Sequence, residues 1–329
     1  MPKFSYDKKS LTGDQLLQAY DDMLNIRKME ENIAKLYSQG LVGGFCHLYI
    51  GQESVASGIK LASEQGDSFI TSYRAHGFSY ICGTSVHKII AELLGRDTGI
   101  SRGKGGSMHM FDSKNHFYGG HGIVGAQTSL GAGIAFANKY LNNKKVCYAL
   151  FGDGAVNQGQ LYEAMNMAKL WSLPIVFILE NNAYSMGTSL ERGCANHLNL
   201  EDRGLGFGIE GVTVNGMDLE EVFSTMKAAR EYAVEHGPIF INCKTYRYKG
   251  HSMSDPAKYR TREEVDSFKS QDCIETVKDI IIKKKFATEE ELKNTAKKIK
   301  DHVKKSSEAA LKDPLPELKE LYTDVTVED

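Results

Sequence analysis

The sequence predicts an α/β fold: a mostly parallel sheet flanked by helices, with a helical C-terminal segment. The clearest sign is a strand–helix–strand unit, in which apolar runs at residues 146–151 and 175–179 flank a helical pattern at residues 158–171. Further apolar runs at residues 68–71, 212–214 and 238–246 alternate with helical patterns, as in other α/β chains. After residue 261 only charged, helix-like segments follow.

Composition excludes several classes of protein. The chain has 329 residues, 41% hydrophobic and 25% charged, which is ordinary for a soluble globular protein. The formal net charge of −2 implies no general attraction to nucleic acid or to anionic membranes, and no apolar run is long enough to span a bilayer. Six scattered cysteines without a CxxC pair indicate buried, reduced thiols, and the N-terminus lacks a signal-peptide pattern. We therefore expect a cytoplasmic protein.

The first third of the chain is expected to be mainly helical. Residues 1–12 read as a loose N-terminal arm. Thr12 and Gln15 form a capping-box pattern that opens a helix to about residue 39, where Gly43-Gly44 stops the pattern. A second helix is expected at 53–63, a strand at 68–71, and a helix capped by Ser85 and ending near residue 94.

Residues 95–125 are rich in glycine and show no long apolar period, yet they contain several aromatic and methionine side chains. We interpret this stretch as a packed, ligand-facing loop. Within it, residues 120–125 match GxGxxG. The pattern does not predict a dinucleotide site, because no convincing strand precedes it and position 145 is a lysine where an acidic residue would be expected.

The remaining elements follow in order. A helix of small residues at 129–140 should pack tightly on the sheet or on another subunit, and residues 183–211 should be irregular. A helix at 219–236 precedes the last strand, and residues 247–261 form a polar loop. Thr261 caps the next helix, and two charged helices finish the chain, with Leu292, Ala296, Ile299 and Val303 as a buried stripe. We expect one domain spanning residues 1–329, with about 262–329 as its helical C-terminal segment.

Asp153 and Asn182 come directly after the two strands of the strand–helix–strand unit. Because parallel strands end at the same edge of a sheet, the two side chains should lie side by side. Two side-chain oxygens, with glycines that let backbone N–H groups approach a ligand, suit a hard cation that holds a phosphate. Taken separately, Gly152-Asp153-Gly154 could be only a β-turn and Asn181-Asn182 only a polar loop.

These motifs resemble those of a known family. Gly152-Asp153-Gly154 with Asn181-Asn182 looks like the motif of thiamine-diphosphate enzymes. The chain is further similar to the alpha subunits of the decarboxylating component of pyruvate dehydrogenases, within the 2-oxo acid dehydrogenase family, from about residue 15 to 325. The motifs that carry this similarity are Phe45-Cys46-His47, Tyr73-Arg74-Ala75-His76-Gly77, Gly105-Gly106-Ser107-Met108-His109-Met110 and Tyr246-Arg247-Tyr248-Lys249-Gly250-His251-Ser252-Met253-Ser254-Asp255-Pro256.

The resemblance implies a thiamine-diphosphate-binding fold and assigns roles to individual residues. Magnesium would be held by the Asp153 and Asn182 side chains and by the Tyr184 carbonyl. The cofactor would be contacted by Tyr73, Arg74, Gly122, Val124, Asp153, Gly154, Ala155, Asn182 and His251, with Gly154 and Ala155 at a helix N-terminus that favours the diphosphate. His47 and His251 would be the catalytic residues, facing substrate and the active-site mouth. For His76, His109 and His121 a structural role stays equally open.

The resemblance also implies what this chain lacks. The glutamate that activates the cofactor would belong to a separate beta subunit, with two alpha and two beta subunits assembling on a dihydrolipoyl acetyltransferase core. Pyruvate would be oxidatively decarboxylated and a lipoyl group reductively acetylated, feeding acetyl-CoA synthesis. Ser252 and Ser189 align with phosphorylated serines of mitochondrial relatives. The third such serine, which precedes Tyr-Arg in those relatives, is absent here, where the sequence is Ala257-Lys258-Tyr259-Arg260. Since no transit peptide precedes the chain, we expect a bacterial enzyme in which Ser252 is structural.

Three alternatives remain at this point. The same cofactor could serve an acetoin or a branched-chain 2-oxo acid dehydrogenase. The pattern at residues 120–125 could belong to a NAD-binding Rossmann dehydrogenase. The chain could also be a non-catalytic scaffold subunit that retains the motifs without the activity.

Overall fold

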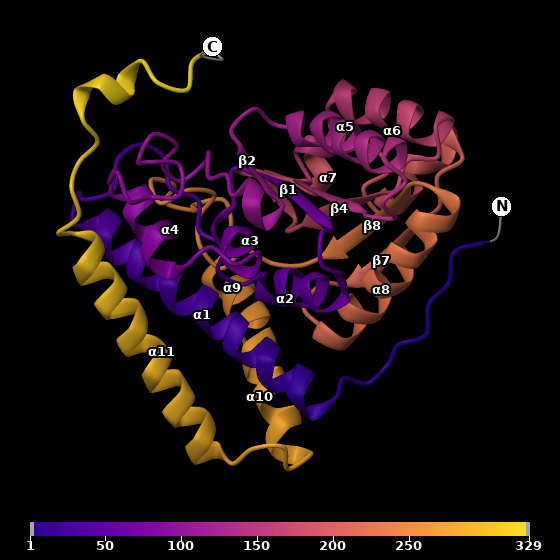
Figure 1. Cartoon of the computed structure of the whole chain (residues 1–329). Helices are drawn as coiled ribbons and strands as arrows, with labels where there is room; N and C mark the ends of the chain where they lie inside the picture. The colour runs from indigo at the N-terminus through magenta and orange to yellow at the C-terminus, as the bar shows by residue number, and fades with distance from the viewer. Residues whose placement is uncertain (1–2, 327–329) are drawn as a thin grey trace.

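A computed structural model describes residues 3–326 of the chain. Its centre is a sheet of six parallel strands in the order β2-β1-β3-β4-β8-β7, with helices on both faces (Figure 1). The strands are β1 (Ser68–Ser72), β2 (Phe117–His121), β3 (Cys147–Gly152), β4 (Ile175–Asn181), β7 (Gly211–Asn215) and β8 (Ile239–Lys244). A small antiparallel pair, β5 (Tyr184–Ser185) and β6 (Thr188–Ser189), lies apart. The predicted α/β fold with a mostly parallel sheet is therefore confirmed.

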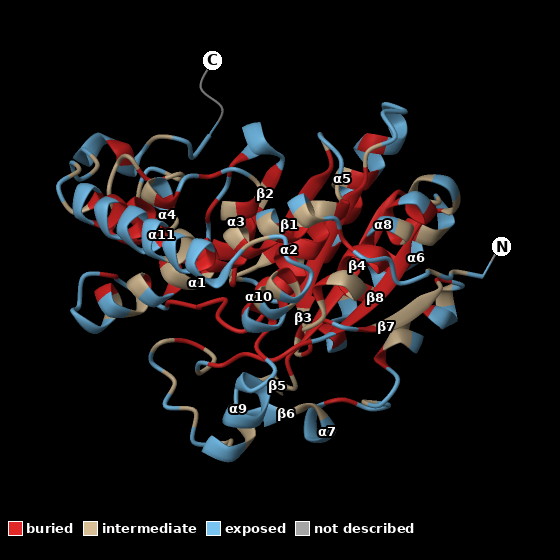
Figure 2. Ribbon diagram, turned by 90° about the horizontal axis from the view of Figure 1, so that it is seen from below, coloured by how far each residue is buried: buried red, intermediate tan, exposed pale blue. Residues whose placement is uncertain are grey.

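The central strands are buried on both faces, which explains why they read as continuous apolar runs (Figure 2). Along β3, Tyr148 and Leu150 join one hydrophobic cluster, whereas Cys147, Ala149 and Phe151 join the other. One face is covered by α5 (Ala126–Tyr140), α6 (Gly159–Leu170) and the 3-10 helix η3 (Leu200–Phe207). The helices on the other side of the sheet share one hydrophobic cluster, and they are α1 (Gly13–Ser38), α2 (Glu53–Ala62), α3 (His76–Ile81), α4 (Val86–Leu93), α8 (Leu219–His236), α10 (Cys273–Lys283) and α11 (Glu289–Ala310). Among them, α8 packs on β4, β7 and β8, whereas α10 and α11 pack on the helices α1, α2 and α4.

Local signals account for most helix boundaries. The capping box of Thr12 and Gln15 begins α1 as predicted, and Thr288 with Glu291 forms a second one at α11. Ser85 caps α4, and Thr261 caps α9 (Arg262–Lys269). The small-residue helix α5 packs closely on the sheet, because a Cβ at Gly131 would lie 2.9 Å from the Cβ of Ala149 in β3. The remaining short elements are α7 (Leu190–Gly193), η1 (Ser113–Asn115), η2 (Ala155–Asn157) and η4 (Leu318–Leu321).

Four sequence-based expectations need correction. The predicted end of α1 near residue 39 is confirmed at Ser38, but the glycine that follows it in a left-handed conformation is Gly40, so Gly43-Gly44 is not the stop signal. Residues 76–81 form α3, which the sequence did not predict. A helix shorter than two turns is too short to show a hydrophobic period. A strand, β2, does lead into the GxGxxG stretch, so the stated objection to a dinucleotide site was wrong on that point. Residues 183–211 also contain short strands and helical turns within their irregular path.

The N-terminal arm is attached to the molecule and is not loose. It has no regular secondary structure, but it lies along α8 (Figure 1). The backbone N–H of Lys9 donates to Ser224 Oγ at 2.8 Å, and that of Leu11 donates to Glu220 Oε1 at 3.0 Å. Phe4 meets the ring of Tyr232 edge-on. Residues 1 and 2 of the predicted arm lie outside the described residues.

The C-terminal segment packs back onto the first helix, since α11 lies alongside α1 (Figure 1). Within the predicted stripe Leu292, Ile299 and Val303 are buried, and Ala296 is half-buried. Residues 327–329 of this segment lie outside the described residues. The lysines at 283–285, 297 and 298 are exposed, and all six cysteines are free thiols. None of the helices within residues 3–326 is long and apolar enough to cross a membrane.

Candidate active site

A cavity of about 310 Å³ opens at the carboxyl ends of the central strands. Ser72 ends β1, Asp153 follows β3, Asn182 follows β4, Arg247 follows β8, and all four line the cavity together with Val124 from the loop after β2. After β1 the chain adds β2 on one side of β1, and it then returns to add β3 on the other side, so the direction in which strands are added reverses at β1. Such a reversal of strand order is where open α/β sheets bind ligands.

The predicted meeting of Asp153 and Asn182 is confirmed. Strands β3 and β4 are parallel neighbours, paired up to Gly152 opposite Glu180, so the residues that follow them emerge at one edge. Both side chains are buried, and Asp153 Oδ2 has no hydrogen-bond partner among the described residues. Burial raises the pKa of Asp153 to about 6, although the Arg247 guanidinium opposes this rise. A cation at this point would satisfy the unpaired oxygen and favour the charged carboxylate.

Arg247 reveals how the oxygens around Asp153 are arranged. Its Nη1 donates to Asn182 Oδ1 at 2.8 Å and to the Tyr184 carbonyl at 3.2 Å. Two of the three oxygens predicted for a metal thus converge on one cationic group. Within residues 3–326 no group of three or more His, Cys, Asp or Glu side chains could hold a metal ion. The donor set here is instead one carboxylate, one amide and one carbonyl, which suits a magnesium ion that takes its other ligands from phosphate and water.

A second buried guanidinium, Arg74, faces the same cavity. It donates to the carbonyls of Leu48 and His251, so its orientation is fixed by backbone. Burial lowers the pKa of Arg74 to about 10, and the neighbouring Arg247 lowers it in the same sense. Two guanidiniums in one buried site repel each other, and a bound diphosphate would relieve that repulsion and accept their hydrogen bonds.

His251 lines this cavity, and His47 lies next to it, behind the Tyr73 ring of the cavity wall. Their ring centroids are 5.3 Å apart, and the ring of Tyr73 lies 4.5 Å from His47 and 5.5 Å from His251. The Nδ1 atom of each histidine is buried and has no hydrogen-bond partner among the described residues. Burial, reinforced by the Arg74 guanidinium, lowers the pKa of His47 to about 2 and that of His251 to about 3. Both imidazoles are therefore neutral near pH 7.

These two histidines predict how stability depends on pH. Because both pKa values lie below the ordinary value of about 6.5, the unfolded chain takes up protons that the fold cannot accept. The free energy of unfolding of the cofactor-free protein should therefore fall as pH drops from about 6.5 toward 3. The slope is at most roughly 1.4 kcal/mol per pH unit for each histidine. Urea unfolding at pH 7, 6 and 5 measures it.

Substituting either histidine isolates its share of this slope. His47→Asn and His251→Asn should each remove the contribution of one proton, while His116→Asn, at an exposed histidine outside the cavity, controls for the substitution itself. Equal slopes in wild type and in both cavity variants would contradict the assignment of neutral, buried imidazoles.

The loop after β8 is ordered around Asp255. Its carboxylate accepts hydrogen bonds from the backbone N–H of His251 at 2.6 Å, from that of Ala257 at 2.8 Å and from the Tyr259 hydroxyl at 2.8 Å. The Tyr259 oxygen in turn accepts from Arg247 Nη2 at 3.0 Å. The loop that places His251 is therefore tied to the same arginine that contacts Asn182.

Ser252 and Ser189, the two serines singled out by resemblance, differ in their surroundings. Ser252 is buried, and its Oγ lies 2.9 Å from Ser254 Oγ. Ser189 is half-buried at the end of β6. That Ser252 is structural in this chain stays a prediction.

All predicted site residues except His47 and Gly122 line the cavity. His47 lies one ring behind the wall, against Tyr73. Gly122 lies against the His109 ring, where an added Cβ would come within 3.0 Å of Nε2.

One local expectation changes at Gly154 and Ala155. Helix α6 begins only at Gly159, and a short 3-10 turn lies between. The two residues therefore face the cavity from that turn and not from the first turn of α6.

Sequence reasoning missed several residues of the wall, namely Gln52, Gln127, Gln158, Glu180, Ser185, Met186 and Arg247. Two of them carried a signal: Arg247 lies inside a quoted motif, and Glu180 directly precedes Asn181. Glu180 is buried and accepts a hydrogen bond from the Tyr49 hydroxyl. Burial raises the pKa of Glu180 to about 7. The glutamines had no detectable signal, because only the folded chain brings them to the site.

Comparison with known proteins gives a consistent result. The family model "Dehydrogenase E1 component" matches residues 21–319. The chain is 54% identical to the "Pyruvate dehydrogenase E1 component subunit alpha" of Rhizobium meliloti over 315 residues, covering 94% of this chain and 89% of that protein. It is 50% identical to the protein of the same name from Rickettsia typhi, covering 95% and 96%. A mitochondrial relative of that name from Dictyostelium discoideum is 48% identical, covering 98% and 85%.

Proposed function

The chain belongs to the dehydrogenase E1 component family, and we propose that it acts as the alpha subunit of the decarboxylating component of a pyruvate dehydrogenase. The reaction is the oxidative decarboxylation of pyruvate. The observation that carries this proposal is the joining of Asp153, Asn182, Arg74 and Arg247 around one cavity at the strand ends, in a chain about half identical to proteins of that name.

Thiamine diphosphate is the cofactor that this family implies. When bound, it supplies the electron sink that decarboxylation of a 2-oxo acid needs. We propose that Tyr73, Arg74, Gly154 and Ala155 hold its diphosphate, while Gly122 and Val124 line the rest of it. We further propose magnesium as the cation, held by Asp153, Asn182 and the Tyr184 carbonyl. The unpaired Asp153 Oδ2 and the two converging oxygens at Arg247 support a cation at this point.

His47 and His251 are proposed to act on the substrate. Both rings lie beside Tyr73, which lines the cavity, and both are neutral, so each can accept or donate a proton through a ring nitrogen. Their unpaired Nδ1 atoms are available for a hydrogen bond to a bound carboxylate or carbonyl oxygen.

The alpha subunit requires a beta subunit as partner. We propose that the beta subunit contributes the glutamate that activates the cofactor, that two alpha and two beta subunits assemble, and that the lipoyl domain of a dihydrolipoyl acetyltransferase core accepts the acetyl group. We also propose that residues 1–329 form one thiamine-diphosphate-binding domain.

Reconstitution tests this function. The chain alone should not decarboxylate pyruvate, whereas adding a beta subunit, magnesium and thiamine diphosphate should give activity with an artificial electron acceptor. Robust activity of the single chain would contradict the division of the site between two subunits.

A substrate panel decides between the related enzymes. If 3-methyl-2-oxobutanoate or acetoin were turned over as well as pyruvate or better, the choice of pyruvate would be wrong. Quenching of NADH fluorescence by the chain, unaffected by thiamine diphosphate, would instead support the Rossmann alternative.

A further inference from the structure

A chain of buried hydrogen bonds lies directly behind the candidate site. The Glu30 carboxylate of α1 accepts from His76 Nδ1, with the atoms 2.9 Å apart, and His76 Nε2 lies 2.9 Å from Ser107 Oγ. The backbone N–H of His47 donates to the same Ser107 oxygen at 3.2 Å. The chain thus connects α1, the start of α3 and the glycine-rich loop to the segment that carries His47.

The order of groups resembles a hydrolase triad of acid, histidine and serine, but the surroundings exclude that use. Glu30 and His76 are 0% exposed and Ser107 is 3% exposed, so no substrate can approach the hydroxyl. Ser107 does not line the site cavity. Glu30, His76 and Ser107 instead satisfy one another's hydrogen-bonding groups, and together they fix the backbone of the segment that carries His47.

Glu30 and Ser107, the two ends of this series of hydrogen bonds, both hold the segment around His47. Ser107 receives the N–H of His47, and Glu30 receives the N–H of Tyr49 at 2.8 Å through its other oxygen. Between these two bonds, the Leu48 carbonyl accepts from Arg74. Because these bonds hold the backbone on both sides of the His47 Cα–Cβ bond, they limit the directions in which the His47 ring can leave the backbone.

The loop that carries Ser107 is held by a second buried carboxylate, that of Glu92 in α4. Its two oxygens accept four backbone N–H groups, from Ser101 at 2.8 Å, Gly103 at 2.9 Å, Gly105 at 2.7 Å and Gly106 at 3.0 Å. The last of these immediately precedes Ser107. The glycine-rich loop is therefore wound around one carboxylate, which gives the serine a defined position although the loop has almost no regular secondary structure.

We propose that Glu30, His76 and Ser107 are positioning residues that hold His47 in place for the reaction. The inference rests on the proposed function, in which His47 acts on the substrate. The hydrogen-bond directions are consistent: His76 donates through Nδ1–H to the carboxylate, accepts the Ser107 hydroxyl proton at Nε2, and leaves the Ser107 oxygen to accept the His47 N–H.

The central test replaces Ser107 with alanine in the assembled enzyme, with Ser101→Ala as the matched control. Ser101 lies in the same loop, but its hydroxyl donates to the His109 carbonyl and accepts from the Phe111 N–H, both of which are backbone groups. Ser107→Ala should lower kcat by about 10- to 100-fold, the range expected when a supporting partner is lost. The affinity for thiamine diphosphate should change by less than about threefold, and Ser101→Ala should keep wild-type kcat.

A double-mutant cycle separates positioning from a general structural role. If Ser107 acts through His47, then Ser107→Ala should cost little further activity in a His47→Ala background, measured as single-turnover decarboxylation. An equal loss in both backgrounds would overturn the proposal. Glu30→Gln offers a second variant, because an amide has one accepting oxygen where the carboxylate has two, so either the His76 Nδ1–H or the Tyr49 N–H loses its acceptor and kcat should also fall.

Hydrogen exchange of the His47 amide gives a readout without turnover. In the wild-type protein this amide should exchange slowly, and in Ser107→Ala it should exchange at least tenfold faster, whereas Ser101→Ala should leave it slow. Unchanged exchange in Ser107→Ala would overturn the inference whatever the activities. A wild-type assembly that exchanges as expected but does not decarboxylate pyruvate would contradict the proposed function, and with it the role assigned to His47.

Discussion

Replacing Asp153 with alanine is expected to lower pyruvate decarboxylation by the assembled enzyme by a factor on the order of 10² or more. A metal ion stabilises charge by several kcal/mol, and each 1.4 kcal/mol corresponds to a factor of ten. Asp153 is the acidic member of the proposed metal set, and its Oδ2 is buried without a partner among the described residues. Titration of activity with thiamine diphosphate at several magnesium concentrations measures the loss.

Another aspartate of the same chain supplies a control for this substitution. Asp202 is exposed and lies outside the cavity, so Asp202→Ala should keep wild-type activity. Asp153→Asn keeps the volume and one oxygen but loses the charge, and it should retain part of the affinity at high magnesium. Full activity of Asp153→Ala would instead require that the chain is a scaffold subunit with unused motifs.

Asp153 and Asn182 could be predicted to meet because two rules act on a short stretch of sequence. Both apolar runs are short enough for strands, and a strand–helix–strand unit places its strand ends at one edge. No contact distant in sequence is needed for that argument. The same reasoning explains why β3, α6 and β4 were placed within a few residues of their observed bounds.

Arg247 and Glu180 show where such reasoning stops. Arg247 reaches Asn182 from the loop after β8, a strand that lies beside β4 although a long stretch of sequence separates the two strands. Only the strand order of the sheet creates that contact. The strand β2 was missed for a related reason: it is an edge strand with two glycines, Gly119 and Gly120, and it has no apolar run of its own. Its pairing with β1 supplies the stability that its sequence lacks.

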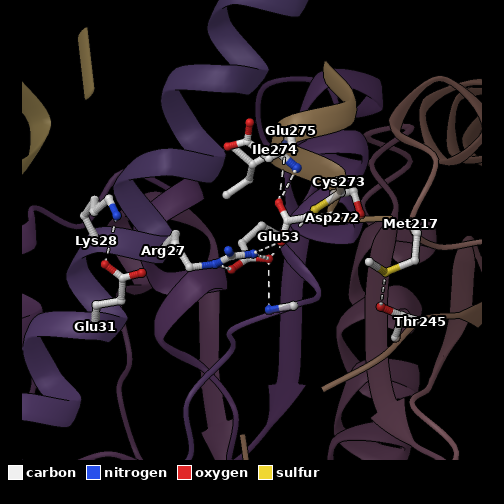
Figure 3. A network of polar contacts seen from close by, with 12 residues as sticks. Arg27, Lys28, Glu31, Glu53, Met217, Thr245, Asp272, Cys273, Ile274 and Glu275 are labelled. Carbon is white, nitrogen blue, oxygen red and sulfur yellow. Dashed lines mark hydrogen bonds and ion pairs between the residues drawn. The ribbon is translucent and has the colours of Figure 1, made fainter. Parts of the chain in front are cut away.

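A buried ion-pair network connects the C-terminal helices to the site. In Figure 3 the Arg27 guanidinium of α1 lies between the carboxylates of Glu53 and Asp272. Glu53 also accepts the backbone N–H of Gly51 at 3.0 Å, and Asp272 caps α10. Although burial alone would lower the pKa of Arg27, these two carboxylates raise it above its ordinary value. This ion-pair network therefore joins α1, α2 and the start of α10, which are distant in sequence.

Removing Glu53 should destabilise the protein by about 3–5 kcal/mol, because a buried guanidinium would lose its main partner. The Glu53 side chain is 0% exposed, so water cannot replace it. Glu53→Ala leaves a cavity as well, whereas Glu53→Gln keeps the volume and isolates the loss of charge. The free energy of unfolding, measured in urea on the cofactor-free chain, should fall in both variants.

The matched control is Glu31→Gln in α1, where Lys28 and Glu31 form an exposed ion pair that is also drawn in Figure 3. Their side chains are 30% and 49% exposed, so that pair should contribute less than about 1 kcal/mol. Equal effects of Glu53→Gln and Glu31→Gln would contradict a stabilising network.

The network should also affect the site, and this separates it from a merely stabilising contact. Gly51, whose φ is +104°, is adjacent to Gln52 in the cavity wall, and a Cβ at Gly51 would lie 2.4 Å from the Tyr246 carbonyl. The Arg27 guanidinium lies 5.3 Å from the centre of the Tyr248 ring, at the start of the loop that carries His251. Loss of Glu53 should therefore weaken binding of thiamine diphosphate at temperatures where the protein is still folded. If Glu53→Gln lost stability but bound the cofactor as wild type does, the network would support only the fold.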